Sequence, residues 1–128
     1  MAVSVADKIL IIEDDVDVLE TVARVLGGEG YSTVGALNGN QGIAAVQAQH
    51  PTLVITDLFM PDKEGIETIL ELRQLRPDLK IIAISGGGSL RNMEVLEMAG
   101  KLGASAILAK PFEPEELLDT VRSVLYAQ

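Results

Sequence analysis

Short apolar runs alternate along this chain with segments whose apolar residues recur at helical spacing. The runs are Lys8–Ile12, Tyr31–Leu37, Thr52–Thr56, Lys80–Ser85 and Ser105–Ala109. Runs this short and this apolar are typical of strands that are buried on both faces of a parallel sheet. The intervening segments predict helices over Asp15–Leu26, Asn40–Gln49, Glu64–Arg76, Leu90–Leu102 and Pro114–Tyr126. Strands that alternate with helices predict an α/β fold, with one doubly wound parallel sheet covered by helices on both faces.

Glycine and proline residues set the expected ends of these helices. Gly27 and Gly28 are expected to end the first helix, and Pro77 the third. The third helix is expected to turn one apolar side inward, made of Ile66, Ile69, Leu70 and Leu75. The last helix is expected to bury Leu117, Leu118, Val121, Val124 and Leu125. His50, before Pro51, is interpreted as structural or exposed to solvent.

Length and composition exclude several classes of protein. The 128 residues are predicted to form one domain spanning 1–128. With 19 acidic against 10 basic side chains, the net charge of −9 disfavours binding to nucleic acid or to a membrane surface. The chain has no cysteine, which excludes disulfides, thiolate zinc sites and thiol nucleophiles. No apolar run approaches the ~20 residues of a membrane span, and a cytoplasmic location is expected.

Polar residues follow four of the five predicted strands. In open parallel sheets, binding sites form beyond the carboxyl ends of the strands. The residues placed there are Glu13, Asp14, Asp15, Asp57, Ser85 and Lys110. Carboxylates that converge in this way repel one another unless a cation is present, and Mg²⁺ accepts oxygen ligands of this kind. An aspartate beside Mg²⁺ can attack a phosphoryl group, with a lysine to balance the developing charge. The group therefore predicts a carboxylate nucleophile in a phosphoryl-binding site.

The motifs around these residues resemble those of one family across nearly the whole chain. The matching segments are Ile9–Asp15, Leu53–Asp62, Gly65, Ile84–Gly86, Gly103–Ala104 and Lys110–Phe112. Together they resemble the receiver domain of two-component response regulators, close to the stand-alone kind typified by the chemotaxis regulator. The resemblance implies a flavodoxin-like sheet of five parallel strands in the order 2-1-3-4-5, with five helices on its two faces.

The resemblance also implies a role for each site residue. Asp57 would be the phosphoacceptor, Ser85 would hydrogen-bond the phosphoryl group and Lys110 would pair with it. Magnesium would be held by Asp14, by Glu13 largely through water, by Asp57 and by the backbone carbonyl of Phe59. The family uses two of the three consecutive acids, which leaves Asp15 as the expected N-cap of the first helix. The Lys110–Pro111 peptide bond is expected to be cis.

Three features bear on how such a switch would work in this chain. The family usually carries an aromatic residue three positions before the lysine, and Ile107 stands there. Three glycines follow Ser85, so the loop 86–89 and the helix Leu90–Leu102 are expected to carry the switch instead. Phe59 stands two positions after Asp57, where a bulky side chain is expected to exclude water and lengthen the life of the phosphorylated state.

The function expected is a phosphorylation-dependent signalling switch. A histidine kinase or histidine phosphotransfer protein would phosphorylate Asp57 in a Mg²⁺-dependent reaction, and an unknown protein would read the result, with no separate substrate turned over. The chain would be a stand-alone regulator or the receiver part of a longer one. The alternatives are a receiver that only docks to partners, a flavodoxin-like ligand binder and a phosphoaspartyl hydrolase. The intact Asp57 and Lys110 argue against a receiver that only docks. The acids after the first strand argue against the ligand binder, which would carry a phosphate-binding loop there. Phe59 argues against the hydrolase, which would carry a second acid at that position.

Overall fold

A computed structural model describes residues 7–58, 65–85, 97, 100–101 and 103–126. The strands are β1 (Lys8–Ile12), β2 (Ser32–Ala36), β3 (Leu53–Asp57), β4 (Lys80–Ser85) and β5 (Ala106–Ala109). The helices with described bounds are α1 (Val16–Gly28), α2 (Gly39–Gln49), α3 (Gly65–Leu75) and α5 (Pro114–Leu125). Residues 97, 100 and 101 are helical and fall inside the expected helix Leu90–Leu102. The rest of that helix, the loop 86–89 and Phe59 lie outside the described residues.

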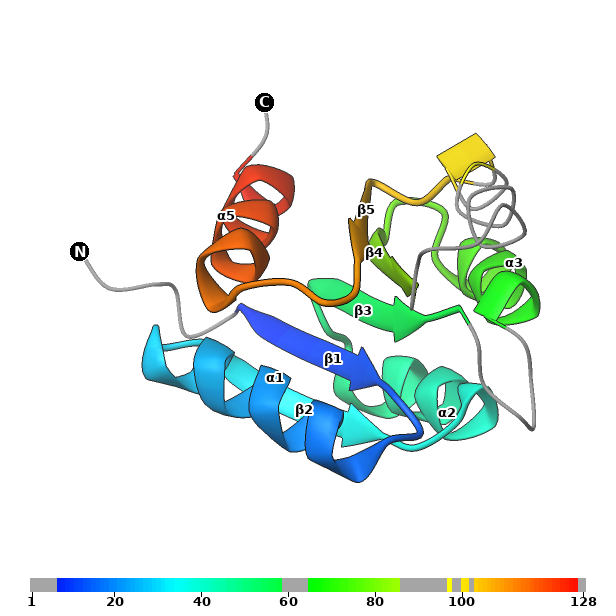
Figure 1. The fold of residues 1–128 in the computed structure, drawn as a ribbon. Coiled ribbons are helices and arrows are strands. Elements are labelled where there is room, and N and C mark those ends of the chain that lie inside the picture. The colour runs from blue at the N-terminus through cyan, green and yellow to red at the C-terminus, as the bar shows by residue number, and fades with distance from the viewer. Residues whose placement is uncertain (1–6, 59–64, 86–96, 98–99, 102, 127–128) are drawn as a thin grey trace.

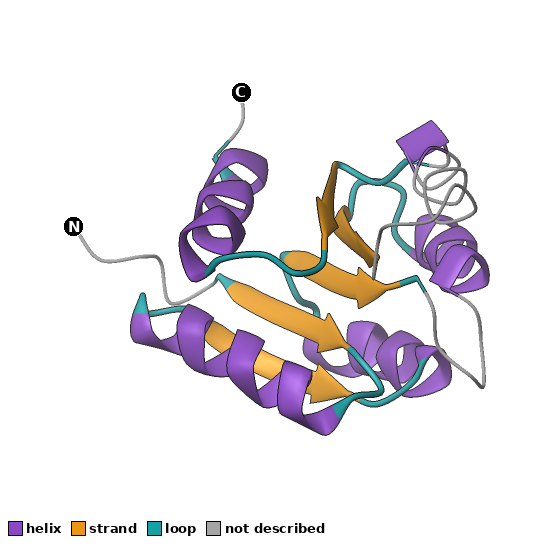
Figure 2. Ribbon diagram, viewed as in Figure 1, coloured by secondary structure: helices purple, strands orange, loops and turns teal. Residues whose placement is uncertain are grey.

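The strands form one parallel sheet in the order β2-β1-β3-β4-β5 (Figure 1). Each neighbouring pair is parallel, with registers such as Ile11 beside Ile55 and Ile55 beside Ile82. The predicted strand order is confirmed. Because the strands are parallel, every connection must cross back over a face of the sheet, and α1, α2 and α3 lie in the first three crossings (Figure 2).

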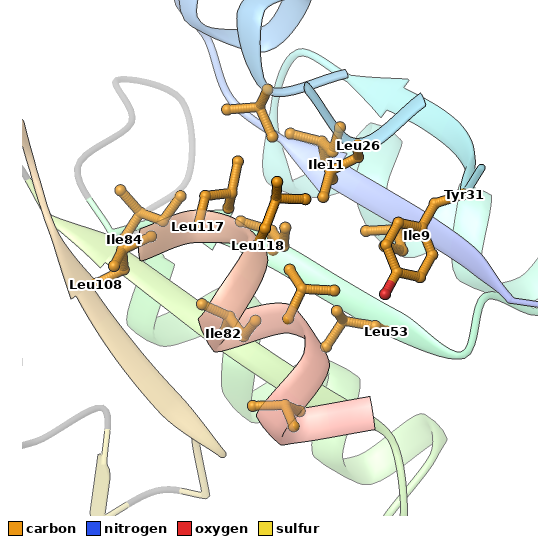
Figure 3. Close-up of a cluster of buried hydrophobic side chains, with 14 residues drawn as sticks. Ile9, Ile11, Leu26, Tyr31, Leu53, Ile82, Ile84, Leu108, Leu117 and Leu118 are labelled. Atoms are coloured by element: carbon orange, nitrogen blue, oxygen red, sulfur yellow. The ribbon is translucent and has the colours of Figure 1, made fainter. Parts of the chain in front are cut away.

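Alternate residues of each strand pack on opposite faces of the sheet. Ile9 and Ile11 belong to a core under α1 and α5, while Leu10 and Ile12 belong to a second core under α2 and α3. Figure 3 shows the first core, where Leu117 and Leu118 of α5 lie over side chains from β1, β3 and β4. Both faces are buried, which is why the strands read as continuous apolar runs instead of alternating ones.

Two helix details differ from the sequence-based expectation. The first helix does not end at Leu26 but continues through Gly27 and Gly28. A Cβ at either glycine would meet open space, so no close contact requires glycine there. After the helix, the chain takes a positive φ at Gly30, 97°. None of the helices in the described ranges is long and apolar enough to cross a membrane.

The buried side of α3 also differs. It consists of Gly65, Thr68, Ile69 and Leu72. Leu70 and Leu75 were expected to point inward, but they are 44% and 42% exposed. Successive helical residues are turned by about 100°, so a stripe through residues 65, 68 and 72 leaves Leu70 facing outward. In α5, the expected inward residues are confirmed, with Leu117, Leu118, Val121 and Val124 buried and Leu125 partly buried against the same core.

The parallel sheet brings the carboxyl ends of all strands to one edge. The residues that follow β1, β3, β4 and β5 therefore come together there, although the chain separates them widely. Figure 1 shows β1, β2 and β3 pointing toward the same side of the molecule. This edge positions the candidate site.

Candidate functional site

Asp57 is the last residue of β3 and is buried, with 5% of its surface exposed. The backbone around it is held from two sides. The Leu58 N–H donates to the carbonyl oxygen of Ile84 on β4 at 2.9 Å, and the Thr56 hydroxyl donates to the Asp57 carbonyl oxygen at 3.2 Å. The carboxylate therefore stands on a strand end that is fixed by the sheet itself.

Lys110 approaches Asp57 from the end of β5. Its N–H donates to the carbonyl oxygen of Ser85 at 2.7 Å, which extends the pairing of β5 with β4 by one residue. Its Nζ lies 3.0 Å from Asp57 Oδ2 and 2.9 Å from Glu13 Oε1. The peptide bond that follows, to Pro111, is cis as expected. One ammonium group thus bridges two buried carboxylates, that of Asp57 at the end of β3 and that of Glu13 directly after β1.

The three consecutive acids have three different environments. Glu13 is 3% exposed, and its backbone N–H donates to the carbonyl oxygen of Ala36, the last residue of β2. Asp14 is exposed. Asp15 is the N-cap of α1, where its Oδ1 accepts hydrogen bonds from the N–H groups of Asp17 at 3.0 Å and Val18 at 3.3 Å. The structure therefore confirms the capping role predicted for Asp15.

Glu13, Asp14 and Asp57 form a group that can hold a metal ion. Each offers a carboxylate oxygen, and these oxygens lie within 4.8 Å of one another. A donor set made of oxygens alone suits a hard dication such as Mg²⁺, which binds through a few carboxylates and keeps several waters. The exposure of Asp14 leaves one side of the group open to solvent, so the residues present fit this ion.

Burial governs the electrostatics of this group. Burial raises the pKa of the Glu13 carboxyl from 4.5 to about 7, against the hydrogen bonds from Lys110 and the Asp15 N–H, which lower it. Burial acts to lower the pKa of Lys110, but the hydrogen bonds to Glu13 and Asp57 outweigh it and leave that pKa raised. Lys110 therefore stays charged, while Glu13 changes its charge near neutral pH.

Ser85 ends β4 beside the same strand end. Its side chain is fully buried, and its Oγ has no hydrogen-bond partner in the described part of the structure. A buried hydroxyl without a partner is costly, and native proteins rarely retain one without a use. This hydroxyl is available to a group placed between the ends of β3 and β5.

Ile107 lies on the outer side of the edge strand β5 and is 41% exposed. A Cβ built on Gly100 would lie 3.5 Å from Ile107 Cδ1, so the side chain extends toward that helical residue. The other predicted site residue, Phe59, is not among the described residues. The structure thus brings together Glu13, Asp14, Asp57 and Lys110, and places Ser85 next to them.

A hollow beside Lys110 was missed by sequence reasoning. Its volume is about 510 Å³, and it lies between α1 and the segment that follows β5. It is lined by Asp17, Val18, Thr21, Val22, Lys110, Pro111 and Phe112. In the sequence, the large apolar side chain of Phe112, two residues after Lys110, indicates one wall of this hollow. That α1 forms the opposite wall is shown only by the fold.

Comparison with known proteins shows one consistent similarity. A family model described as "Response regulator receiver domain" matches residues 9–122. The chain is 31% identical to "Sporulation initiation phosphotransferase F" of Bacillus subtilis (strain 168), over 93% of this chain and 94% of that protein. It is 34% identical to "Response regulator MprA" of Mycolicibacterium vanbaalenii, over 92% of this chain but 50% of the relative. It therefore spans about half the length of that relative.

Solved structures agree with this. A CheY-like response regulator receiver domain protein from Methanospirillum hungatei JF-1 superposes with a TM-score of 0.83 and 33% identity, over 93% of each chain. The receiver domain of NtrX from Brucella abortus superposes with a TM-score of 0.88 and 30% identity, over 94% of this chain and 99% of that one.

Proposed function

The chain belongs to the response regulator receiver domain family, and from this premise we propose that it is a signalling switch phosphorylated on Asp57. The phosphoryl donor would be a histidine kinase or a histidine phosphotransfer protein. The observation that carries the proposal is the convergence of Asp57 and Lys110, 3.0 Å apart, with the oxygens of Glu13 and Asp14.

In this proposal, each residue of the group has a separate role. The carboxylates of Glu13, Asp14 and Asp57, with the backbone carbonyl that the resemblance assigns to Phe59, would hold Mg²⁺. When bound, this ion neutralises charge on the phosphoryl oxygens. Lys110 pairs with one of those oxygens and Ser85 donates its hydroxyl hydrogen to another. Among the described residues, the Ser85 Oγ has no hydrogen-bond partner, which supports this role because the phosphoryl group would supply an acceptor.

The reaction follows from the position of Asp57. One oxygen of its carboxylate attacks the phosphorus of a phosphohistidine, forming a P–O bond as the P–N bond breaks. The bonding electron pair leaves on the imidazole nitrogen of the donor. Lys110 moves its hydrogen bond from the carboxylate toward the new phosphoryl oxygens, so the cation already present balances the added charge.

The hollow beside Lys110 supports a protein as donor. Its walls include Val18 and Val22 of α1 and Phe112, and it opens next to the lysine. An apolar side chain of the donor that packs between α1 and Phe112 would orient a phosphohistidine toward Asp57. The matched protein from Bacillus subtilis carries the name phosphotransferase, which fits a chain that receives and passes on a phosphoryl group.

We propose that the phosphorylated state is transmitted without an aromatic side chain. Ile107 stands where the family usually has an aromatic residue, and an isoleucine has no ring to turn inward. Its side chain is exposed and extends toward Gly100. The segment 86–102 that follows Ser85 would carry the change. Amide exchange with and without a phosphoryl mimic tests this, and unchanged protection over residues 86–102 would contradict it.

A direct test is incubation with acetyl phosphate and Mg²⁺, followed by measurement of the intact mass. We expect a gain of one phosphoryl group in the natural sequence, no gain in Asp57→Asn and no gain when EDTA replaces Mg²⁺. A gain that persists in Asp57→Asn would refute Asp57 as the acceptor. No gain in any variant would favour a receiver that only docks to partners.

A further inference from the structure

Gly65, the first residue of α3, touches the backbone at the phosphoacceptor position. A Cβ built on Gly65 would lie 2.4 Å from Leu58 Cα and 2.6 Å from the Asp57 carbonyl oxygen. Both atoms belong to the backbone, so no flexible side chain can move aside to make room. Any side chain at position 65 must therefore displace either α3 or the end of β3.

The same stretch of backbone is held on its other sides. The Gly65 N–H donates to the Leu58 carbonyl oxygen at 3.1 Å, and the Leu58 N–H donates to the Ile84 carbonyl oxygen at 2.9 Å. The buried Thr56 hydroxyl donates to the Asp57 carbonyl oxygen at 3.2 Å. The peptide group between Asp57 and Leu58 is thus enclosed by α3, by β4 and by its own strand.

The need for glycine at position 65 comes from this contact and not from backbone conformation. Within the described residues, the glycines with positive φ are Gly30 and Gly103, and Gly65 is not one of them. Alanine can adopt the backbone of Gly65 and has the higher helix propensity. Only the approach to Leu58 and Asp57 opposes an alanine there.

We propose that Gly65 and Thr56 are positioning residues for the phosphoacceptor. The missing Cβ lets α3 abut the Asp57–Leu58 peptide, and this contact fixes the Asp57 carboxylate at 3.0 Å from Lys110 Nζ and beside the oxygens of Glu13 and Asp14. The inference rests on the proposed phosphorylation of Asp57. It goes further by naming residues outside the carboxylate group that set the geometry of the reaction.

The variant Gly65→Ala has a matched control in Gly42→Ala. A Cβ on Gly42 would lie 2.3 Å from Ile12 Cδ1, an equally close contact, but with the end of a side chain that can rotate. The maximal rate of phosphoryl incorporation at saturating acetyl phosphate is compared at a temperature where both variants are folded. We expect a loss of about tenfold or more in Gly65→Ala, since a displacement of about 1 Å can cost about a hundredfold. We expect no loss in Gly42→Ala.

A second measurement needs neither Mg²⁺ nor reaction. The amide exchange rate of the Leu58 N–H, compared with that of core amides in β1, reports whether its bond to Ile84 is disturbed locally. We expect faster exchange of Leu58 in Gly65→Ala, beyond the change in the β1 amides, and no such difference in Gly42→Ala. Natural maximal rate and natural Leu58 exchange in a folded Gly65→Ala would overturn the inference.

Thr56→Val keeps the inference testable if Gly65→Ala does not fold. The valine adds no bulk and removes only the hydroxyl that donates to the Asp57 carbonyl oxygen. We expect a smaller loss in maximal rate, about threefold, and an unchanged rate in this variant would then overturn the inference. If the natural sequence itself incorporates no phosphoryl group, the proposed function fails. Amide exchange of Leu58 in Gly65→Ala and Thr56→Val still decides whether Gly65 and Thr56 position the Asp57–Leu58 peptide.

Discussion

Lys110 and Asp57 are 53 positions apart in the chain, and their side chains meet at 3.0 Å. The contact is made because β5 and β3 end at the same edge of the sheet, with β4 between them. The same Nζ also contacts Glu13 at 2.9 Å. A single cation therefore stabilises two carboxylates that the fold has removed from water, and several properties of the site depend on it.

Replacing Lys110 by methionine should lower stability and slow phosphorylation. Breaking a buried ion pair costs about 3–5 kcal/mol, and because the Lys110 side chain is 25% exposed we expect a loss of about 2 kcal/mol. Urea unfolding in EDTA measures this. Phosphorylation by acetyl phosphate should slow by about a hundredfold, since one charge-stabilising group is removed.

Magnesium should stabilise Lys110→Met more than it stabilises the natural protein, because it restores the missing positive charge. The matched control is Lys101→Met, which removes an exposed lysine from the helical residues before β5. That variant should keep its stability and its rate. An equal effect of the two substitutions would mean that net charge, and not the contact with Asp57, is responsible.

Asp15→Ala should separate capping from catalysis within the acidic triplet. The two hydrogen bonds that Asp15 Oδ1 accepts at the start of α1 would be lost, which costs about 1 kcal/mol. The phosphorylation rate should not change, whereas Asp14→Ala should lower Mg²⁺ affinity. Denaturant unfolding and a Mg²⁺ titration measure the two effects. Weaker Mg²⁺ binding in Asp15→Ala would assign this residue to the metal group instead.

The parallel sheet and the site residues could be predicted because both depend on short patterns, whereas the strand order came only from the resemblance to receiver domains. Apolar runs mark the strands, and the residue after each run must lie at the carboxyl edge, so Glu13, Asp57 and Lys110 follow from their places in the chain. The inward side of α3 could not be predicted in this way. Leu70 and Leu75 are as apolar as Leu72, and the choice among them depends on how α3 meets the sheet.

Contacts between distant elements also escape sequence reasoning. The closeness of Gly65 to the Asp57 carbonyl oxygen depends on where α3 begins in space, and a lone glycine does not reveal it. The hollow between α1 and Phe112 requires two elements that are separated by most of the chain. Arg73 is a third case. A lone arginine on an amphipathic helix predicts a solvated side chain, but here it hydrogen-bonds carbonyl oxygens of two distant segments, at Leu79 and Gly103.

Arg73→Met should lower stability although Arg73 lies away from the site. Its guanidinium donates to the carbonyl oxygens of Pro77 and Leu79 before β4, and to that of Gly103 before β5. Hydrogen bonds from charged groups contribute about 1.5–3 kcal/mol each, and partial exposure reduces this, so we expect a loss of about 2–3 kcal/mol. Urea unfolding measures the loss.

Arg76→Met is the control for Arg73, because within the described residues the Arg76 guanidinium donates to one carbonyl oxygen, that of Pro51, at 2.6 Å. A loss of about 1 kcal/mol is expected there. Exchange of the Ser105 N–H, which donates to the Ile81 carbonyl oxygen, should quicken in Arg73→Met only. Equal losses in the two variants would show that Arg73 does not link the two segments.

Glu13 should give the metal-free protein a distinct dependence on pH. Burial raises the pKa of this carboxyl to about 7 in the folded protein, above its ordinary value of 4.5. Between these two values the folded state binds more protons than the unfolded state, so the free energy of unfolding falls as pH rises through this window and then levels off. Glu13→Gln cannot lose a proton, so the difference between the two proteins isolates the residue from His50 and the other acids. Urea unfolding in EDTA at closely spaced pH values should show the natural protein losing stability relative to Glu13→Gln up to about pH 7. A relative gain over that window would mean that Lys110 holds Glu13 ionised and that the ion pair outweighs burial.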